Sequence, residues 1–168
     1  NYKTVMSDAA SGFTSVTYPF PVIRMADLYL MYAEALNEKG EDYATVLPWI
    51  DMVRERSGLQ GVKESWDQYV GNSKYATQTG LRQIIMQERR IELAFEGHYF
   101  WDVRRWKTAT TELTQPLTGW KVRYGETDVD YYSENLVLVR DFTPKMYFWP
   151  IDIGELRKDP NLVQNYGW

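Results

Sequence analysis

Apolar side chains recur at helical spacing in three segments of the chain. The first segment runs from Arg24 to Gly40, and Asp27, Glu34 and Glu38 fall on its polar side. Its apolar side carries five large residues with three more beside them: Met25, Leu28, Tyr29, Tyr32 and Leu36, and Ala26, Leu30 and Ala33. Gly40 can adopt the left-handed backbone conformation that ends many helices. We therefore expect a helix that stops at Gly40.

The second segment predicts a helix that packs against the first. Four apolar residues recur at helical spacing before Gly58: Val46, Trp49, Ile50 and Val53. Thr45 is the expected N-cap, because Pro48 then lies in the first turn, where proline removes no backbone hydrogen bond. The two helices are expected to form an antiparallel hairpin from Ala26 to Leu59, which has about the 34-residue length of a tetratricopeptide unit.

A third helix is predicted from Thr79 or Gly80 to Phe95. Residues 60–79, which precede it, are polar, punctuated by glycine and aperiodic. That composition predicts an exposed loop.

The C-terminal part of the chain contains many turn residues. Residues 134–142 and 143–151 predict two strands around a Thr-Pro-Lys turn, and the tail 153–168 predicts a loop. The predicted fold class is mainly α-helical, with the tetratricopeptide-like hairpin, the further helix and a small C-terminal β-hairpin and loop region.

Two carboxylates fall on the apolar side of the third predicted helix, Glu88 in its middle and Glu92 at its edge. One interpretation is the acid and base pair of a glycoside hydrolase. The other is structural, because a buried charge is tolerated only when it is paired. The candidate partners are five arginines: Arg54, Arg89, Arg90, Arg104 and Arg105. We favour pairing, since a nearby arginine lowers a carboxyl pKa and a general acid needs a raised one.

Composition excludes several classes of function. The chain has 168 residues, 44% of them hydrophobic and 25% charged, which suits one globular domain or a piece of a larger one. Its net charge is −4, its acidic and basic residues are interspersed, and it has no run of lysine or arginine. The sequence therefore does not predict a basic surface for nucleic acid. With no cysteine and with His98 as the single histidine, thiol catalysis and multi-histidine or cysteine metal sites are excluded. His98 follows Gly97 and is interpreted as a hydrogen-bonded residue at a helix C-terminus rather than a general base.

Aromatic residues make up 15% of the chain and need an explanation. Four of them follow the third predicted helix: Tyr99, Phe100, Trp101 and Trp106. They could form a platform for sugar rings, or they could pack a junction with arginines stacked on their faces. We favour packing for most of them. No apolar run approaches the ~20 residues of a membrane-spanning helix, and the opening residues lack the pattern of a secretion signal.

Several blocks of the sequence together resemble the C-terminal part of the SusD/RagB family. They are RMADLYLMYAEALNEKG, then IDMVRERSGL, then ERRIELAFEGHYFWDVRRW, and finally NLVQNYGW. The resemblance implies a largely helical, non-enzymatic lipoprotein on the outer face of the outer membrane. It also implies a SusC-like TonB-dependent transporter as partner and no cofactor. Residues 1–168 lack the lipid-bearing cysteine and the N-terminal helices of that family, so we expect a C-terminal portion of such a domain.

The expected function is therefore binding of a glycan for uptake, with an oligopeptide as the alternative ligand and a glycosidase that uses Glu88 and Glu92 as the least favoured. Aromatic residues on polar segments could stack on sugar rings. The expected ligand-binding residues are Trp66, Tyr69, Tyr75 and Trp120, with Tyr124, Tyr131 and Tyr132 as weaker candidates.

Overall fold

The computed structural model describes residues 21–120 and 127–168, and the chain divides into two compact units. The first unit ends at Glu92 and the second begins at Leu93. Most secondary structure in the described residues is helical, and their strands form one two-stranded antiparallel sheet. The mainly α-helical fold class is therefore confirmed. None of the helices in these ranges is long and apolar enough to span a membrane.

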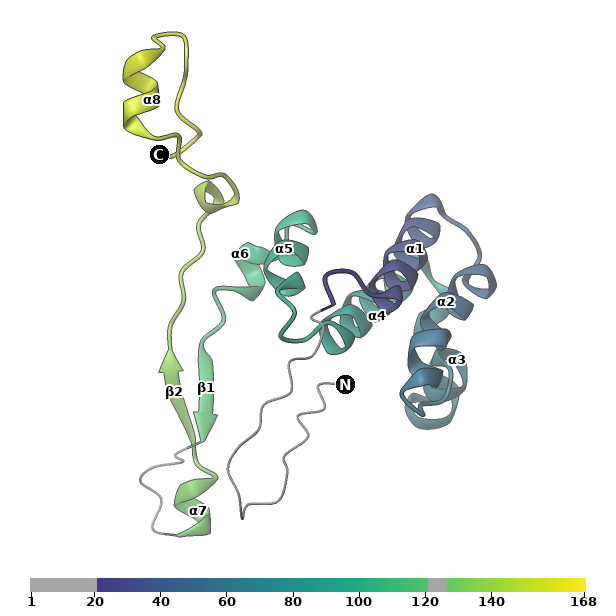
Figure 1. Ribbon diagram of the computed structural model, residues 1–168. Helices are drawn as coiled ribbons and strands as arrows, with labels where there is room; N and C mark the ends of the chain where they lie inside the picture. The colour runs from purple at the N-terminus through teal and green to yellow at the C-terminus, as the bar shows by residue number, and fades with distance from the viewer. Residues whose placement is uncertain (1–20, 121–126) are drawn as a thin grey trace, which may run out of the picture. The chain divides into compact units, whose positions relative to one another are not determined.

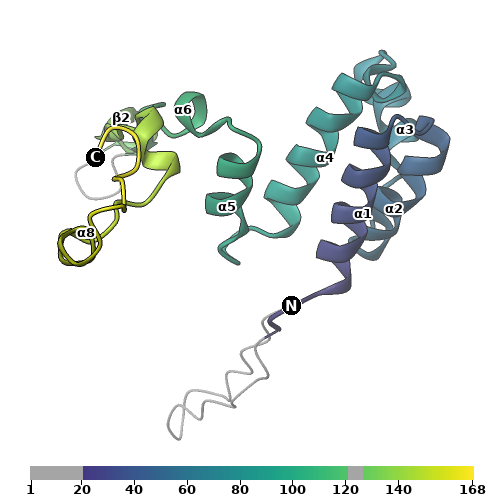
Figure 2. The same ribbon diagram turned by 90° about the horizontal axis from the view of Figure 1, so that it is seen from above.

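The first unit is built on a helical hairpin. Helix α1 (Met25–Lys39) packs against both α2 (Tyr43–Arg56) and α4 (Gln78–Glu92), and the three helices lie side by side in Figures 1 and 2. As expected, α1 ends at Gly40, which has a φ of 88° and donates its amide to the Asn37 carbonyl. The core consists of twelve buried residues: Ala26, Leu30, Ala33, Val46, Leu47, Ile50, Val53, Val62, Tyr75, Leu81, Ile84 and Ile85.

The buried side of α1 differs from the predicted one. Ala26, Leu30 and Ala33 face the core, whereas Met25 is 57% exposed and Tyr32 is 48% exposed. Because α1 contacts two helices, small side chains at the contact allow a close approach that bulkier ones would prevent. Tyr29 and Leu36 pack against the core as expected, whereas Met25, Leu28 and Tyr32 were assigned to the wrong face.

Helix α2 begins earlier than predicted. Asp42, not Thr45, is the N-cap, and its Oδ1 accepts a hydrogen bond of 2.8 Å from the Ala44 amide. Pro48 therefore lies in the second turn, where it removes the hydrogen bond to the Ala44 carbonyl. Pro48 and Ala44 are both exposed, so water can bind the free carbonyl.

Residues 60–79 are more ordered than the predicted loop. They contain α3 (Val62–Ser65), a π-helical turn (Trp66–Val70) and a 3-10 turn (Lys74–Ala76). The Asp51 carboxylate accepts a hydrogen bond of 2.7 Å from the Val62 amide, and the Val62 side chain is fully buried. Burial raises the pKa of Asp51, and the hydrogen bond partly offsets that rise. The segment thus stays fixed to α2 by a polar and an apolar contact.

Helix α4 ends at Glu92 rather than at Phe95. Phe95 has a φ of 65° and a fully exposed side chain, so it lies outside the helix and outside the core. Ile91, in the last turn of α4, is 63% exposed. Arg89 occupies the buried side instead, next to Ile85.

Ion pairs join α4 to the other two long helices. Arg54 of α2 donates to Glu88, which confirms one of the expected pairings. Glu92 is also paired, but with Arg56 at 2.8 Å and with Arg24 at 2.6 Å, neither of which was a predicted partner.

A further pair lies deeper in the first unit. Arg89 Nη1 donates to Asp27 Oδ1 at 2.8 Å, and both residues are buried. Asp27 was expected on the polar side of α1. Its burial follows from this pairing, because a buried carboxylate needs a cation or hydrogen-bond donors.

The second unit consists of short elements around a small core. Its helices are α5 (His98–Arg105), α6 (Ala109–Glu112), α7 (Asp128–Tyr131) and α8 (Ile153–Lys158), with a 3-10 turn η3 (Pro144–Tyr147). Strand β1 (Leu117–Trp120) pairs antiparallel with β2 (Glu134–Leu138), as Figure 1 shows. Buried side chains of three segments form the core: Val103, Ala109 and Phe142.

Three predictions for this unit were wrong in detail. Helix α5 was not predicted, and His98 begins this helix instead of capping the end of α4. The partner of β2 is β1, because Pro144 starts the 3-10 turn η3 rather than a hairpin. The tail contains α8, whose N-cap Asp152 accepts a hydrogen bond of 2.7 Å from the Gly154 amide.

Replacing Glu88 tests whether the pairing supports the fold. We expect Glu88→Ala to lower the free energy of unfolding by about 3 kcal/mol, because Arg54 loses its carboxylate in a largely buried place. Urea unfolding at pH 7 measures the change.

Glu38→Ala is the matched control. Glu38 pairs with Arg82 of α4 at 2.5 Å on the surface, where both side chains are well exposed. The hydrogen bond from Arg82 holds the pKa of Glu38 below its usual value, but solvent screening limits the contribution to less than about 1 kcal/mol at pH 7. Equal losses in the two variants would contradict the structural role of Glu88.

Candidate functional site

The four expected ligand-binding residues are divided between the two units. Trp66, Tyr69 and Tyr75 belong to the first unit and Trp120 to the second. Trp66 is half-buried, packs against the core, and has the Lys74 ammonium 5.5 Å from its ring centroid. Tyr69, on the same π-helical turn, is 72% exposed, so its ring is accessible to a ligand.

Tyr75 has a different environment from its two neighbours. Its ring is only 5% exposed and meets the Tyr43 ring edge-on at a centroid distance of 5.5 Å. Its hydroxyl donates to Asp67 Oδ1 at 2.8 Å, and this hydrogen bond raises the pKa of Tyr75. Lys63 also binds Asp67, at 2.6 Å. Tyr75 is therefore a core residue, and its ring faces are not available for stacking on a sugar.

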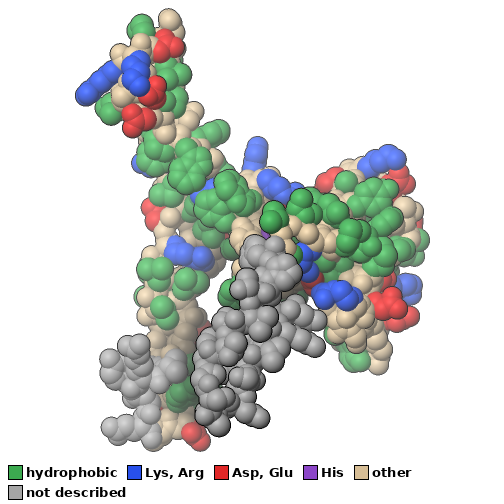
Figure 3. Space-filling view, viewed as in Figure 1, with side chains coloured by type: hydrophobic (Ala, Val, Ile, Leu, Met, Phe, Trp, Pro, Cys, Tyr) green, Lys and Arg blue, Asp and Glu red, His purple; other side chains and the backbone are tan. Residues whose placement is uncertain are grey.

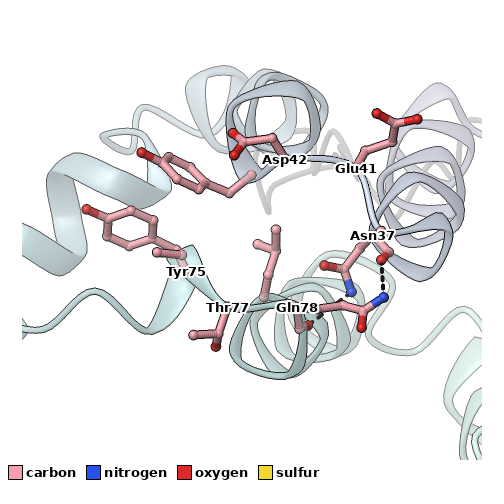
Figure 4. Close-up of a pocket in the computed structure, with 10 residues that line it drawn as sticks. Asn37, Glu41, Asp42, Tyr75, Thr77 and Gln78 are labelled. Atoms are coloured by element: carbon pink, nitrogen blue, oxygen red, sulfur yellow. Dashed lines mark hydrogen bonds between the residues drawn. The ribbon is translucent and has the colours of Figure 1, made fainter.

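The edge of Tyr75 lines a small pocket at the ends of α1 and α4 (Figure 4). Asn37 and Gln78 lie together on one side, where Gln78 Nε2 donates to the Asn37 carbonyl at 2.7 Å and Asn37 Nδ2 to the Gln78 carbonyl at 3.1 Å. Glu41 and Asp42 lie at the turn between α1 and α2. The volume of about 270 Å³ is below that of typical ligand pockets, and each side-chain amide already donates to the backbone carbonyl of the other residue. This pocket is a weak candidate.

Trp120 lies at the end of β1 and is 60% exposed. Its ring meets the Tyr132 ring edge-on at 5.4 Å, and Tyr132 meets Tyr131 at 4.9 Å. The three rings form an aromatic cluster beside the sheet. Tyr124 lies outside the described residues.

A larger cleft lies within the second unit. It has a volume of about 740 Å³ and is lined by α5, the residues that follow α5, η3 and the C-terminal segment. Trp101 is 61% exposed, Phe148 55% and Tyr166 82%, and Tyr147 and Pro144 complete the apolar wall. Figure 3 shows hydrophobic side chains gathered over this part of the unit, with cationic side chains beside them. Ligand pockets are commonly of this size and lining.

The cleft also carries three cations: Arg104, Arg105 and Lys107. The Arg104 guanidinium lies 3.7 Å from the Phe100 ring centroid, and the Arg105 guanidinium lies 4.9 Å from that of Trp106. This confirms that arginines stack on the aromatic residues of this segment. Tyr99, Phe100 and Trp101 nevertheless remain 38%, 39% and 61% exposed, so the prediction that most of the four rings are packed was wrong.

Part of this cleft was accessible to sequence reasoning. Trp101, Arg104 and Arg105 are three and four residues apart, which places them on one side of a helix. The contribution of η3 and Tyr166 could not be found, because neither depends on a local pattern. Tyr147 of η3 packs against the small core, and the segment around Tyr166 is held by hydrogen bonds from Gln164, Asn165 and Trp168 to carbonyls of residues 145–151.

The described residues include no group of three or more side chains placed to hold a metal ion. The two carboxylates considered for hydrolysis, Glu88 and Glu92, lie in the first unit and bind arginines. The described residues thus offer aromatic faces and cations for binding.

Comparison with known proteins places this architecture in a family. The chain is 39% identical to SusD-like protein P25 of Formosa agariphila over 86% of its length, and 28% identical to SusD-like protein P38 of the same organism over the same share. It spans 23% and 24% of those two relatives. A solved SusD-like protein from Bacteroides fragilis matches 85% of the chain and 25% of its own length, with 30% identity and a TM-score of 0.67.

The chain therefore spans about a quarter of the length of the relatives that it matches. The family model described as SusD family matches residues 1–168. Both the sequence and the helical architecture agree with that match. The chain belongs to the SusD family.

Proposed function

We propose that this chain takes part in glycan capture on the outer face of the outer membrane, without catalysing a reaction, and in delivery of the glycan to a SusC-like TonB-dependent transporter. Membership of the SusD family supports glycan binding and nutrient uptake at the level of the family. The observation that carries the proposal for this chain is the cleft of the second unit, whose exposed rings suit stacking on sugars.

The positions of the carboxylates support binding rather than hydrolysis. A glycosidase needs two carboxyl groups on either side of the scissile bond. Glu88 and Glu92 instead hold α4 to its neighbours, and the described residues that line the cleft include no carboxylate. The aromatic wall suits a sugar ring, and the described residues that line it supply no carboxyl group to act as the general acid of a glycosidase.

Trp101→Ala tests the cleft. We expect the affinity for a cognate oligosaccharide to fall about fivefold to tenfold, because ring contacts of this kind are worth on the order of 1 kcal/mol. Isothermal titration against a panel of oligosaccharides measures the change, and a thermal melt checks the fold. Phe95→Ala is the matched control, since it removes an aromatic ring that is fully exposed and does not line the cleft. A folded Trp101→Ala variant with the parental affinity would show that the ligand binds elsewhere.

Trp66 and Tyr69 are proposed as a second contact surface, and Tyr69 is the better probe of it. Trp66 packs against the core, so its removal would lower stability as well as affinity. Tyr69→Ala removes a ring that is 72% exposed and should leave the free energy of unfolding within about 0.5 kcal/mol of the parent. If the surface binds glycan, titration of this variant will show a severalfold weaker affinity. Unchanged binding would remove the π-helical turn from the proposed contacts.

A further inference from the structure

We propose that the cleft lined by α5, η3 and Tyr166 selects acidic glycans, whose sugars carry carboxylate or sulfate groups. The inference rests on the proposed function and names the ligand class of the same cleft. Three cations line it, and no carboxylate does so among the described residues. A cleft of one charge sign favours ligands of the opposite sign.

Arg104 contributes a charge that the described part of the chain does not neutralise. Its guanidinium lies 3.7 Å from the Phe100 ring centroid and 5.0 Å from that of Phe142, so two rings fix its position. The Nε atom is buried without a hydrogen-bond partner among the described residues, and Nη1 makes only a long contact of 3.4 Å with the Phe100 carbonyl. No described carboxylate forms an ion pair with Arg104. A fixed guanidinium with donors to spare is well suited to a carboxylate or sulfate.

Lys107 adds a second such charge. It lies just after the end of α5 with a φ of 58°, where its amide donates to the Arg104 carbonyl at 3.1 Å. Glycine is the residue that fits this left-handed position without strain. Lys107 forms no ion pair with any residue in the described ranges, so its ammonium is available to a ligand. Arg105 contributes less, because its Nε binds Asp102 at 3.0 Å.

The small pocket beside Tyr75 in the first unit shows the opposite charge pattern. Glu41 and Asp42 line the pocket beside Tyr75, and no lysine or arginine does. An acidic ligand would be repelled there and attracted to the cleft of the second unit. The small pocket beside Tyr75 and the cleft therefore favour ligands of opposite charge.

The test compares two ligands with the same sugar backbone, one charged and one neutral. We would titrate the chain with an oligogalacturonate hexamer and with its fully methyl-esterified form, at low and at high salt. At low salt the acid should bind about tenfold more tightly than the ester. Added salt should lower the affinity for the acid and leave the affinity for the ester unchanged. A sulfated galactan hexamer in a third arm shows whether sulfate substitutes for carboxylate.

Lys107→Gly is the decisive variant. It removes the charge and relieves the left-handed strain, so the melting temperature should stay the same or rise. The preference for acid over ester should fall about threefold, and Arg104→Met should lower it further. Lys158→Ala is the control, because it removes one positive charge outside the cleft and should leave the preference unchanged.

The outcomes separate this inference from the proposed function. Equal affinity for acid and ester would overturn acidic selection, and glycan binding would still stand if Trp101→Ala weakened both. A tenfold preference that Lys107→Gly and Arg104→Met leave intact would also overturn it, because the charge recognition would then lie outside the cleft. If none of the three hexamers binds, the inference falls together with the cleft as a glycan site.

Discussion

The ion pair between Arg89 of α4 and Asp27 of α1 is buried more deeply than the other described ion pairs that join the helices of the first unit. Two charges that are almost fully removed from water must meet at 2.8 Å, or each is left with a large desolvation penalty. That requirement fixes how α1 and α4 align along their length. The pairs of Arg54 with Glu88 and of Arg56 with Glu92 then place α2 against the same helix.

This constraint has a direct consequence for function. The carboxylates of α4 are bound to arginines of neighbouring helices, so they stabilise the scaffold and are not free for acid and base chemistry. The cations that line the cleft of the second unit differ from these paired charges. Arg104 and Lys107 lie beside exposed aromatic rings without a described carboxylate partner. The chain thus combines a unit in which the carboxylates of α4 are paired internally with a unit in which Arg104 and Lys107 are available to a ligand.

Sequence reasoning succeeded where local chemistry decides the structure. The glycine stop of α1 and the pairing of Glu88 with Arg54 follow from rules that act within a turn or across one helix contact. Sequence reasoning failed where the packing of distant segments determines which side chains are buried. The buried side of α1 carries alanines because two helices approach it, and the burial of Tyr75 depends on contacts with Asp67 and with the core.

For the candidate cleft, too, sequence reasoning finds features that depend on local spacing and misses those that depend on packing. The spacing of Trp101 and Arg104 predicts a shared helix side, but α5 itself was missed because it is short and follows a turn. The pairing of β1 with β2 was missed because β1 contains Gly119 and shows no alternation. Such features depend on contacts between segments that are distant in sequence, which no single segment specifies.

The central claim is that ligand binds the cleft of the second unit while α1, α2 and α4 of the first unit serve as scaffold. Amide hydrogen exchange of the chain with and without an oligogalacturonate hexamer tests it most directly. The account predicts slower exchange in α5 and in residues 144–148, with α1, α2 and α4 unchanged. Slower exchange confined to residues 62–76 of the first unit, with α5 unaffected, would contradict it.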